Sequence, residues 1–518
     1  MTASDAVPTS CVSFDPQDDS LAGRGDDALP AGTVAAASVP DAADRLDART
    51  LAALATRIKA WGRELGFGAI GISDTDLSAA EAALAAWLEA GCHGEMDYMA
   101  KHGMKRARPA ELVAGTLRVI TARMAYLPAS TIAGGSHEST PSDSGPGDWR
   151  ARERSRLADP MAAVVSVYAR GRDYHKVMRQ RLQQLAERIE RDIGPYGHRV
   201  FTDSAPVLEV ELAQKGNIGW RGKHTLLIER DAGSFFFLGE IYVDIALPID
   251  APVSADALGK THAGDGAAID ADDVIDSNPE GAISRARFDG QLDAGVGTGS
   301  VAKGGEEGNA NAGANAKAAV RPVARQAGAH CGHCTRCIDA CPTGAIVGPF
   351  RVDARRCVSY LTIELKGSIP EALRPLIGNR VYGCDDCQLV CPWNKFAQAA
   401  PVGDFDARHG LDRSTLVDLF AWSAEEFDAR MQGSAIRRIG YECWLRNLAV
   451  GLGNALRADA GAALAKPDRE RIVDALRGRA DDASPLVREH VQWALQATSL
   501  CAVDEQRKAG SDDEGRSN

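Results

Sequence analysis

Eight of the twelve cysteines lie between residues 331 and 391, at spacings suited to iron–sulfur clusters. The first run reads Cys-x2-Cys-x2-Cys-x3-Cys-Pro and extends from Cys331 to Cys341. With this spacing, three thiolates bind one [4Fe-4S] cluster and the fourth reaches a second cluster. A second run, Cys384 to Cys391, also ends in Cys-Pro, and Cys357 precedes it. The sequence therefore predicts two [4Fe-4S] clusters.

The expected pairing exchanges the fourth cysteine of each run between the clusters. One cluster would be bound by Cys331, Cys334, Cys337 and Cys391, and the other by Cys341, Cys357, Cys384 and Cys387. The pattern departs from symmetry because Cys357 lies 27 positions before Cys384. Zinc is the alternative metal, since paired Cys-x2-Cys motifs also bind zinc. The two Cys-Pro endings favour clusters, and a single cluster would leave four cysteines unexplained.

The composition indicates a soluble globular protein. The chain has 518 residues, of which 45% are hydrophobic and 25% are charged, enough for about two to four domains. The longest apolar stretch, Phe235–Leu247, is interrupted by Glu240 and Asp244 and is unsuited to spanning a membrane. No export signal is recognisable, so we expect a cytoplasmic protein without a membrane partner.

The net charge of −12 does not exclude a nucleic-acid partner. The excess acid lies in residues 1–50, 251–325 and 502–518, and the remainder of the chain is formally neutral. These acidic segments have few large apolar side chains with which to offset the entropy of ordering. They predict disordered tails over 1–48 and 501–518 and a disordered insertion over 251–325.

The order of the elements predicts an α/β domain over residues 49–250. Helices are expected from Leu51, from a capping box at Ser78–Glu81 and over Asp173–Ile193. Strands are expected over Phe67–Ile72, Leu117–Leu127, Ala162–Ala169, Thr225–Ile228 and Phe235–Leu247. Because strands alternate with helices, a largely parallel or mixed sheet is expected.

The cysteine runs define a module over residues 326–400, and helical periodicity follows over 401–500. The apolar spacing predicts helices over 434–456, 468–476 and 484–495. Ser484 and Pro485 supply an N-cap and a proline at the first helical position. Short amphipathic helices in succession suggest HEAT-like repeats.

Several motifs, in this order along one chain, resemble the epoxyqueuosine reductases. These are cobalamin-dependent iron–sulfur enzymes of tRNA queuosine maturation. The resemblance covers about residues 50–250 and 326–500. It rests on the double cysteine run together with His93–Met99, Asp173–His175, Thr202–Val207, Gly216–Leu227, Cys391–Asn394 and Trp444–Val450.

The resemblance implies a fold, a cofactor and a catalytic acid. The fold class is then α+β multidomain: an α/β cobalamin-binding domain, a two-[4Fe-4S] ferredoxin-like module and HEAT-like helical repeats. Cobalamin would lie between a cluster and the substrate, and Asp203 would act as proton donor, with a pKa raised by burial. The residues expected around cobalamin are Arg108, Asp203, Gly219, Trp220, Lys223 and Gly239. The alternatives are a helix-capping role for Asp203 and core packing for Trp220 and Tyr174.

The implied reaction is reduction of the epoxide of epoxyqueuosine in tRNA to the alkene of queuosine. Electrons would come from an external donor through the clusters, and a monomer is expected. Arg437, Arg438, Arg446 and Arg457 are expected to contact tRNA phosphates. Two alternatives remain at this point: a corrinoid reductive dehalogenase and a non-catalytic two-cluster electron-transfer protein.

Overall fold

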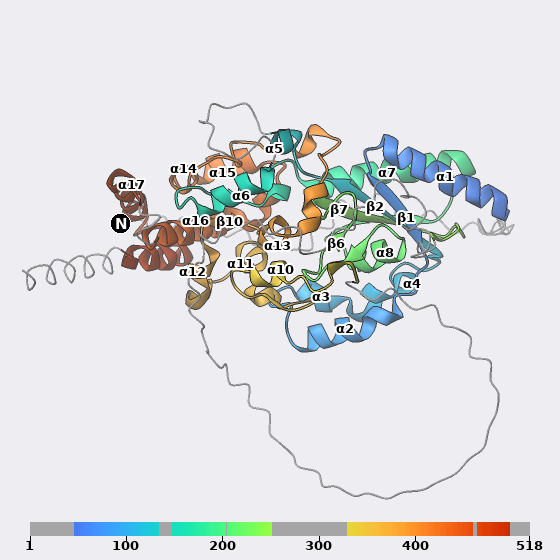
Figure 1. The fold of residues 1–518 in the computed structure, drawn as a ribbon, viewed down its shortest axis with the longest axis horizontal. Coiled ribbons are helices and arrows are strands. Elements are labelled where there is room, and N and C mark those ends of the chain that lie inside the picture. The colour runs from blue at the N-terminus through green and yellow to red at the C-terminus, as the bar shows by residue number, and fades with distance from the viewer. Residues whose placement is uncertain (1–45, 134–147, 204, 251–328, 459–463, 498–518) are drawn as a thin grey trace, which may run out of the picture.

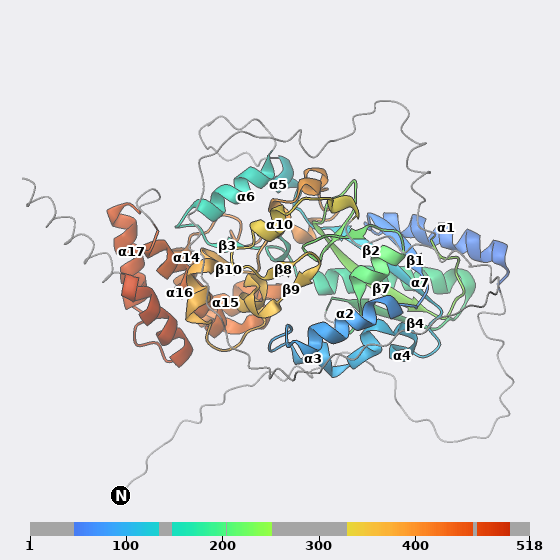
Figure 2. The same cartoon turned by 60° about the horizontal axis from the view of Figure 1, so that its bottom comes forward.

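The computed structural model describes residues 46–133, 148–203, 205–250, 329–458 and 464–497. The expected disordered tails and insertion fall almost wholly outside these ranges. A β-sheet with its covering helices occupies one end of the molecule, the C-terminal helices occupy the other, and the cysteine-bearing elements lie between them (Figure 1, Figure 2). No helix within the described ranges is both long enough and apolar enough to cross a bilayer.

The main sheet is antiparallel, and the expectation of a largely parallel or mixed sheet is wrong. Its strands are β1 (Ala69–Ser73), β2 (Arg118–Ala125), β4 (His198–Thr202) and β7 (Phe236–Val243), in the order β1-β2-β7-β4. Each neighbouring pair is antiparallel. Ser73 at the end of β1 pairs with Val119 at the start of β2. The helices between the two strands therefore return the chain to the same end of the sheet at which β1 finishes. A parallel neighbour would need a connection that crosses the sheet.

Helices cover both faces of this sheet (Figure 1). On one face, α1 (Ala48–Glu64) and α7 (Tyr174–Ile193) pack with the apolar side chains of β7 such as Ile241. On the other face, the short helix α8 (Glu209–Lys215) packs over β1, β2 and β7. The α8 face carries Glu240 and Tyr242 of β7, because successive side chains of a strand alternate between faces.

Smaller elements complete the N-terminal half, and two expectations about them are wrong. Helix α2 begins at Ser78 with Leu77 as N-cap, so the expected capping box is absent, and the backbone N–H of Ser78 donates instead to Asp76. The expected strand over residues 162–169 is reduced to β3 (Val164–Val165) and a 3-10 turn. The remaining elements are α2 (Ser78–Glu89), α3 (Asp97–Lys101), α4 (Pro109–Leu112), α5 (Ala129–Ala133), α6 (Trp149–Ala158), β5 (Trp220–Arg221) and β6 (Leu227–Ile228).

The cysteine-bearing segment is built from short elements. These are α10 (Arg336–Asp339), β8 (Ile346–Gly348), β9 (Arg351–Val352), α11 (Val358–Ile363), α12 (Arg374–Ile377), β10 (Arg380–Tyr382) and α13 (Asp386–Leu389). Strand β10 pairs in parallel with β3 of the preceding domain. The backbone N–H of Ser166 donates to the Tyr382 carbonyl at 2.9 Å, which joins the two parts of the chain directly.

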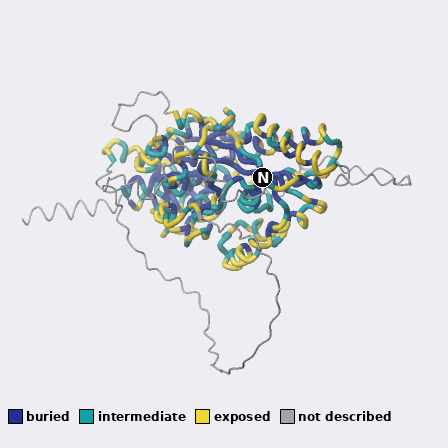
Figure 3. The backbone as a smooth tube through the Cα atoms, turned by 45° about the vertical axis from the view of Figure 1, so that its right-hand side comes forward, coloured by how far each residue is buried: buried dark blue, intermediate teal, exposed yellow. Residues whose placement is uncertain are grey.

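The C-terminal helices form a tightly packed end of the molecule. They are α14 (Leu416–Phe420), α15 (Ala424–Met431), α16 (Gly440–Leu456), α17 (Lys466–Arg477) and a last helix over residues 485–497. Helix α16 is buried over most of its length. The tube coloured by burial shows buried residues inside the molecule and exposed residues at its surface (Figure 3). The Ser484 hydroxyl accepts from the Val487 N–H at 3.2 Å, which confirms the predicted N-cap.

Candidate active site

The first cysteine group gathers at α10 and the end of α13. Burial raises the pKa of the Cys391 thiol to about 12, and the thiols of Cys331, Cys337 and Cys334 add to this rise. The fourth cysteine of the second run therefore lies with the first three of the first run. This is the neighbourhood that the exchanged pairing requires.

The second cysteine group lines a cavity of about 450 Å³. Its members are Cys341, Cys357, Cys384 and Cys387. Burial raises the pKa of Cys387 well above its ordinary value, and Cys357 is the nearby thiol that adds most. No three His, Cys, Asp or Glu side chains in the described ranges lie close enough to hold one metal ion.

Asp203 lines the same cavity and belongs to a chain of hydrogen-bonded side chains. The Tyr174 hydroxyl donates to its carboxylate, and Nε2 of His175 lies 3.4 Å from Oδ2 of Asp203. On the other side of the ring, Nδ1 of His175 lies 2.9 Å from Oδ1 of Asp173. Asp173 is also the N-cap of α7 and accepts the His175 backbone N–H at 3.1 Å. The cap thereby orients the imidazole toward Asp203.

The backbone of Asp203 adopts an uncommon conformation. Its φ of 30° lies in the left-handed region, which Asp enters more readily than most residues but which still costs energy. Helix α8 begins at Glu209 and has Leu208 as N-cap, so the alternative of Asp203 as a helix cap is wrong. A strained aspartate that does not cap α8 and lines the cavity has the features of a functional residue.

The protonation states of these hydrogen-bonded side chains differ from the sequence-based expectation. Burial by itself would raise the pKa of Asp203, but the hydrogen bonds from His175 and Tyr174 and the positive charge of Arg438 outweigh burial and leave that pKa lowered. Burial likewise disfavours charge on His175, yet Asp173 and Asp203 raise its pKa to about 9. The expectation of a raised pKa for Asp203 is therefore wrong. At neutral pH the proton resides on His175, hydrogen-bonded to the Asp203 carboxylate.

Other titratable groups surround the cavity. Burial and the negative charge of Asp203 raise the pKa of Glu209 to about 8. Burial raises the pKa of Glu240 well above its usual range, and both of its carboxyl oxygens lack a hydrogen-bond partner among the described residues. Burial lowers the pKa of His224 to about 4, so this ring is neutral. The cavity lining therefore combines the Asp203 carboxylate with the neutral Glu209 and His224, while Glu240 lies outside the lining residues.

Three of the residues expected around cobalamin lie between the cavity and the first cysteine group. The Trp220 ring lies 4.4 Å from that of His330 and 4.9 Å from that of Trp393, measured between centroids. Lys223 Nζ donates to the Cys334 carbonyl at 2.8 Å. Gly219 packs so closely on β6 that a Cβ atom would overlap the backbone carbonyl of Ile228. These residues attach the β5–β6 hairpin to the cluster segment.

The structure does not bring Arg108 or Gly239 to the cavity. Arg108 forms two hydrogen bonds with the Glu81 carboxylate, of 2.8 and 3.0 Å, outside the residues that line the cavity. Gly239 faces α7, where a Cβ atom would press on Leu182. Conversely, sequence reasoning assigned no role to His175 or Glu209. The signal for His175 was its place in the Asp173–His175 motif.

Asn394 of the Cys391–Asn394 motif is completely buried and fastens the cluster segment to the sheet. Its Oδ1 accepts the Ser234 N–H at 2.6 Å, and its Nδ2 donates to the Gln388 carbonyl at 2.7 Å. Gly233 has a φ of 65° and lies against Asn394, where a side chain would overlap. The motif therefore holds the second cysteine run against β7.

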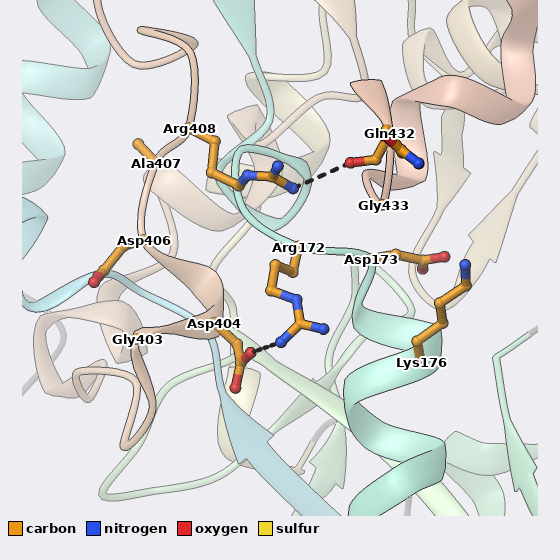
Figure 4. A pocket seen from close by; sticks show the side chains of 10 residues that line it. All are labelled: Arg172, Asp173, Lys176, Gly403, Asp404, Asp406, Ala407, Arg408, Gln432 and Gly433. Atoms are coloured by element: carbon orange, nitrogen blue, oxygen red, sulfur yellow. Dashed lines mark hydrogen bonds and ion pairs between the residues drawn. The ribbon is translucent and has the colours of Figure 1, made fainter. Parts of the chain in front are cut away.

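A second cavity, of about 530 Å³, lies on the other side of Asp173 (Figure 4). Its lining is strongly charged: Arg172 pairs with Asp404 at 2.5 Å, and Lys176 and Arg408 line its wall. None of the cluster cysteines lines this cavity. The chemistry predicted from the sequence therefore belongs to the cavity of the second cysteine group.

That cavity has features suited to cobalamin. Its walls include the apolar side chains of Val210, Leu226, Phe236 and Leu238. The His224 Nε2 lies there and Trp220 Nε1 lies nearby, both buried without a hydrogen-bond partner among the described residues. A flat apolar macrocycle with amide side chains could cover the apolar side chains of the wall and form hydrogen bonds with the two buried ring nitrogens.

The arginines expected to contact tRNA differ in exposure. Arg446 is fully buried and donates to the carbonyls of Leu361, Leu365 and Gly367, so its expected contact with tRNA is wrong. Arg457 packs over the Trp493 ring at 3.9 Å. The side chains of Arg437 and Arg438 are about half exposed, at 50% and 46%.

Comparison with known proteins connects this geometry to a family. Residues 330–394 match a model described as a 4Fe-4S double cluster binding domain, and residues 106–204 match one described as epoxyqueuosine reductase QueG. The chain is 66% identical to the epoxyqueuosine reductase of Burkholderia pseudomallei over 88% of this chain and 95% of the relative. It is 44% identical to that of Escherichia coli, over 88% and 93%.

Solved structures agree with this relationship at the level of the fold. A selenomethionine-labelled epoxyqueuosine reductase aligns with a TM-score of 0.59 at 21% identity, covering 86% of this chain and 90% of the other. An epoxyqueuosine reductase solved with an epoxyqueuosine-modified tRNA stem loop aligns with a TM-score of 0.56 at 19% identity, over 86% and 98%. The identities and coverages of the sequence relatives show that the chain belongs to the epoxyqueuosine reductase family of oxidoreductases, which use two [4Fe-4S] clusters and cobalamin.

Proposed function

We propose that this protein reduces epoxyqueuosine in tRNA to queuosine, the last step of queuosine formation. One observation carries the proposal: a single cavity has four cluster cysteines on its lining together with Asp203, which is hydrogen-bonded to a protonated His175. Such a site joins a source of electrons to a source of protons, and epoxide reduction needs both. The relative solved with a modified tRNA stem loop supports the choice of substrate.

The eight cysteines bind the two clusters in the exchanged pairing, and electrons enter from an external donor. Cobalamin, when bound, would supply the redox chemistry for cleaving the carbon–oxygen bonds. Trp220 and Lys223 are the residues proposed to hold it near the clusters, together with the Gly219 turn. The indole nitrogen of Trp220 is buried and has no hydrogen-bond partner within the described part of the chain. We do not extend this role to Arg108, which pairs with Glu81, or to Gly239, which faces Leu182 of α7.

His175 and Asp203 handle the proton. The imidazolium stores it, Asp203 accepts it from Nε2 and passes it to the epoxide oxygen as the first carbon–oxygen bond breaks. Asp173 fixes the ring and stabilises its charge through Nδ1, as a carboxylate does for a catalytic imidazole elsewhere. The Tyr174 hydroxyl donates to Oδ2 of Asp203, the same oxygen that faces His175.

The tRNA is proposed to bind across the cavity mouth. Arg438 pairs with Glu364 and contributes to the lowered pKa of Asp203, which places its charge near the mouth. Arg437 lies beside it, and both side chains are exposed enough to meet phosphates. The C-terminal helices from α14 onward are proposed to be a HEAT-like module. We further propose a monomer that works in the cytoplasm, where its tRNA substrate is found.

The decisive experiment uses tRNA from a strain that accumulates epoxyqueuosine. The reconstituted protein with a chemical reductant should convert that nucleoside to queuosine, detected by nucleoside mass analysis. Absorption spectra recorded with and without cobalamin address the alternatives. Clusters without bound corrin would indicate an electron-transfer protein. Bound corrin with no conversion of tRNA would favour a reductive dehalogenase-like activity.

A further inference from the structure

The reduction of an epoxide to an alkene consumes two protons. Two carbon–oxygen bonds break, one carbon–carbon double bond forms, two electrons enter through the clusters, and the oxygen leaves as water. The first proton turns the epoxide oxygen into a hydroxyl, and the second turns that hydroxyl into water. The His175–Asp203 pair holds one proton, because Asp203 is ionised while His175 is charged. A second acid is therefore required while the tRNA covers the cavity.

Glu209 is placed to be that acid. It lies in the first turn of α8 and lines the same cavity as Asp203. Within the described ranges its carboxyl makes no hydrogen bond or ion pair, unlike Glu211 of the same helix, which pairs with Arg221 at 2.5 Å. A carboxyl group that shares a cavity with a second carboxylate and lacks a cation favours its neutral form. Environments that separate two carboxyl groups in this way commonly mark an acid and its partner.

The groups around Glu209 support its neutral state. Asp203 raises its pKa, and the imidazolium of His175 lowers it by less, so the value of about 8 leaves Glu209 protonated at neutral pH. Beneath α8, Glu240 of β7 adds a neutral carboxyl and no positive charge. His224, on the cavity wall, is neutral because burial lowers its pKa to about 4. Among these groups, Glu209 is protonated at neutral pH and has a pKa close enough to neutrality to release the second proton that the reaction needs.

We infer that Glu209 is a second catalytic acid, which donates its proton to the hydroxyl formed from the epoxide oxygen. This inference rests on the proposed function. As the second carbon–oxygen bond breaks, the Glu209 proton joins the departing oxygen to form water, and Glu209 is left as a carboxylate. Both acids regain protons from solvent when the product tRNA leaves.

The test compares Glu209→Gln with wild type and with Glu211→Gln, a control that removes a carboxylate from the same helix. Single-turnover rates are measured at saturating tRNA and matched iron and cobalamin content. Glu209→Gln should lose about a hundredfold in rate, the low end for a positioned acid, whereas Glu211→Gln keeps most of it. In wild type the rate should fall as pH rises through about 8, where Glu209 loses its proton.

A second readout does not depend on turnover. Infrared difference spectra of the protein without tRNA should show a protonated carboxyl that titrates near pH 8 in wild type and is missing in Glu209→Gln. In Asp203→Asn the same carboxyl should titrate at lower pH, because the variant removes a negative charge that raises the pKa of Glu209. If wild type converts the tRNA while Glu209→Gln matches its rate and its alkaline decline, the inference is wrong and the proposed function stands. If wild type converts no tRNA, both fall.

Discussion

His175 Nε2 lies 3.4 Å from the Asp203 carboxylate although the two residues come from different elements, the start of α7 and the turn after β4. The antiparallel arrangement of β4 beside β7, with α7 packed on the same sheet, creates this contact. The pair stores one proton at neutral pH as an imidazolium beside a carboxylate. Four predictions follow from this contact, from the cysteine groups and from the packing of α16.

Asp203→Asn should remove proton transfer and keep the fold. The amide is nearly isosteric and still accepts from Tyr174, but it cannot relay the His175 proton. We expect a loss of about a hundred- to ten-thousand-fold in single-turnover rate, with both clusters and cobalamin retained. The measurement is queuosine formation at matched iron and cobalamin content. A rate equal to wild type would remove Asp203 from the mechanism.

Asp173→Asn should lower the pKa of His175 from about 9 toward the value of about 6.5 for an unpaired histidine. The variant loses the negative charge at Nδ1, while asparagine caps α7 about as well as aspartate does. Because the raised pKa keeps the ring charged, its proton is lost at lower pH in the variant. The titration of His175 can be followed by nuclear magnetic resonance, with activity declining over the same pH range. An unshifted titration would contradict the pairing with Asp173.

Cys341→Ala and Cys391→Ala should damage different clusters. Cys341 lines the cavity with Cys357, Cys384 and Cys387, whereas Cys391 lies among the first three cysteines of the other run. Each substitution should therefore disturb the cluster held mainly by the opposite motif. Electron paramagnetic resonance of the reduced variants should show complementary losses. Loss of the same signal in both variants would rule out the exchanged pairing.

Arg446→Met should destabilise the protein. The guanidinium donates to the carbonyls of buried Leu361 and Leu365 and of exposed Gly367, and each buried acceptor left unpaired costs about 1–3 kcal/mol. We expect the free energy of unfolding to fall by at least about 2 kcal/mol, measured by denaturant titration. The control is Arg437→Met, which removes only an exposed pair with Asp428 and should cost less than about 1 kcal/mol. Equal stability of the two variants would contradict a structural role for Arg446.

The cluster ligands could be predicted from the sequence because their positions are local. A spacing of two or three residues between cysteines determines how their thiolates bind one [4Fe-4S] cluster. The expected exchange of the fourth cysteines agrees with the observed neighbours of Cys391. Helix ends with a strong local signal were also predictable, as at Ser484, whereas the same signal failed at Ser78 because α2 begins one residue earlier than a cap requires.

Contacts between distant segments were beyond such reasoning. Burial alone predicted a raised pKa for Asp203, but the opposing groups, His175 and Tyr174, are about thirty residues away in sequence and meet it only through the sheet. The relative direction of neighbouring strands could not be predicted either. An alternation of strands and helices does not show whether each connection crosses the sheet, as parallel pairing requires, or returns at the same end. Arg446 resembled a surface charge because helical periodicity could not show that α16 is enclosed on nearly all sides.

The parallel pairing of β3 with β10 has a mechanical consequence. Hydrogen bonds between buried backbone groups join the domain that holds Asp203 to the segment that holds Cys384 and Cys387, and the buried Asp385 carboxylate reinforces the joint by accepting the Val167 N–H at 2.8 Å. A hinge here would expose or break those bonds, so we expect β3 and the second cysteine run to move as one unit. Because these bonds do not include the turn after β4, a movement of that turn would displace Asp203 and leave Cys384 and Cys387 in place.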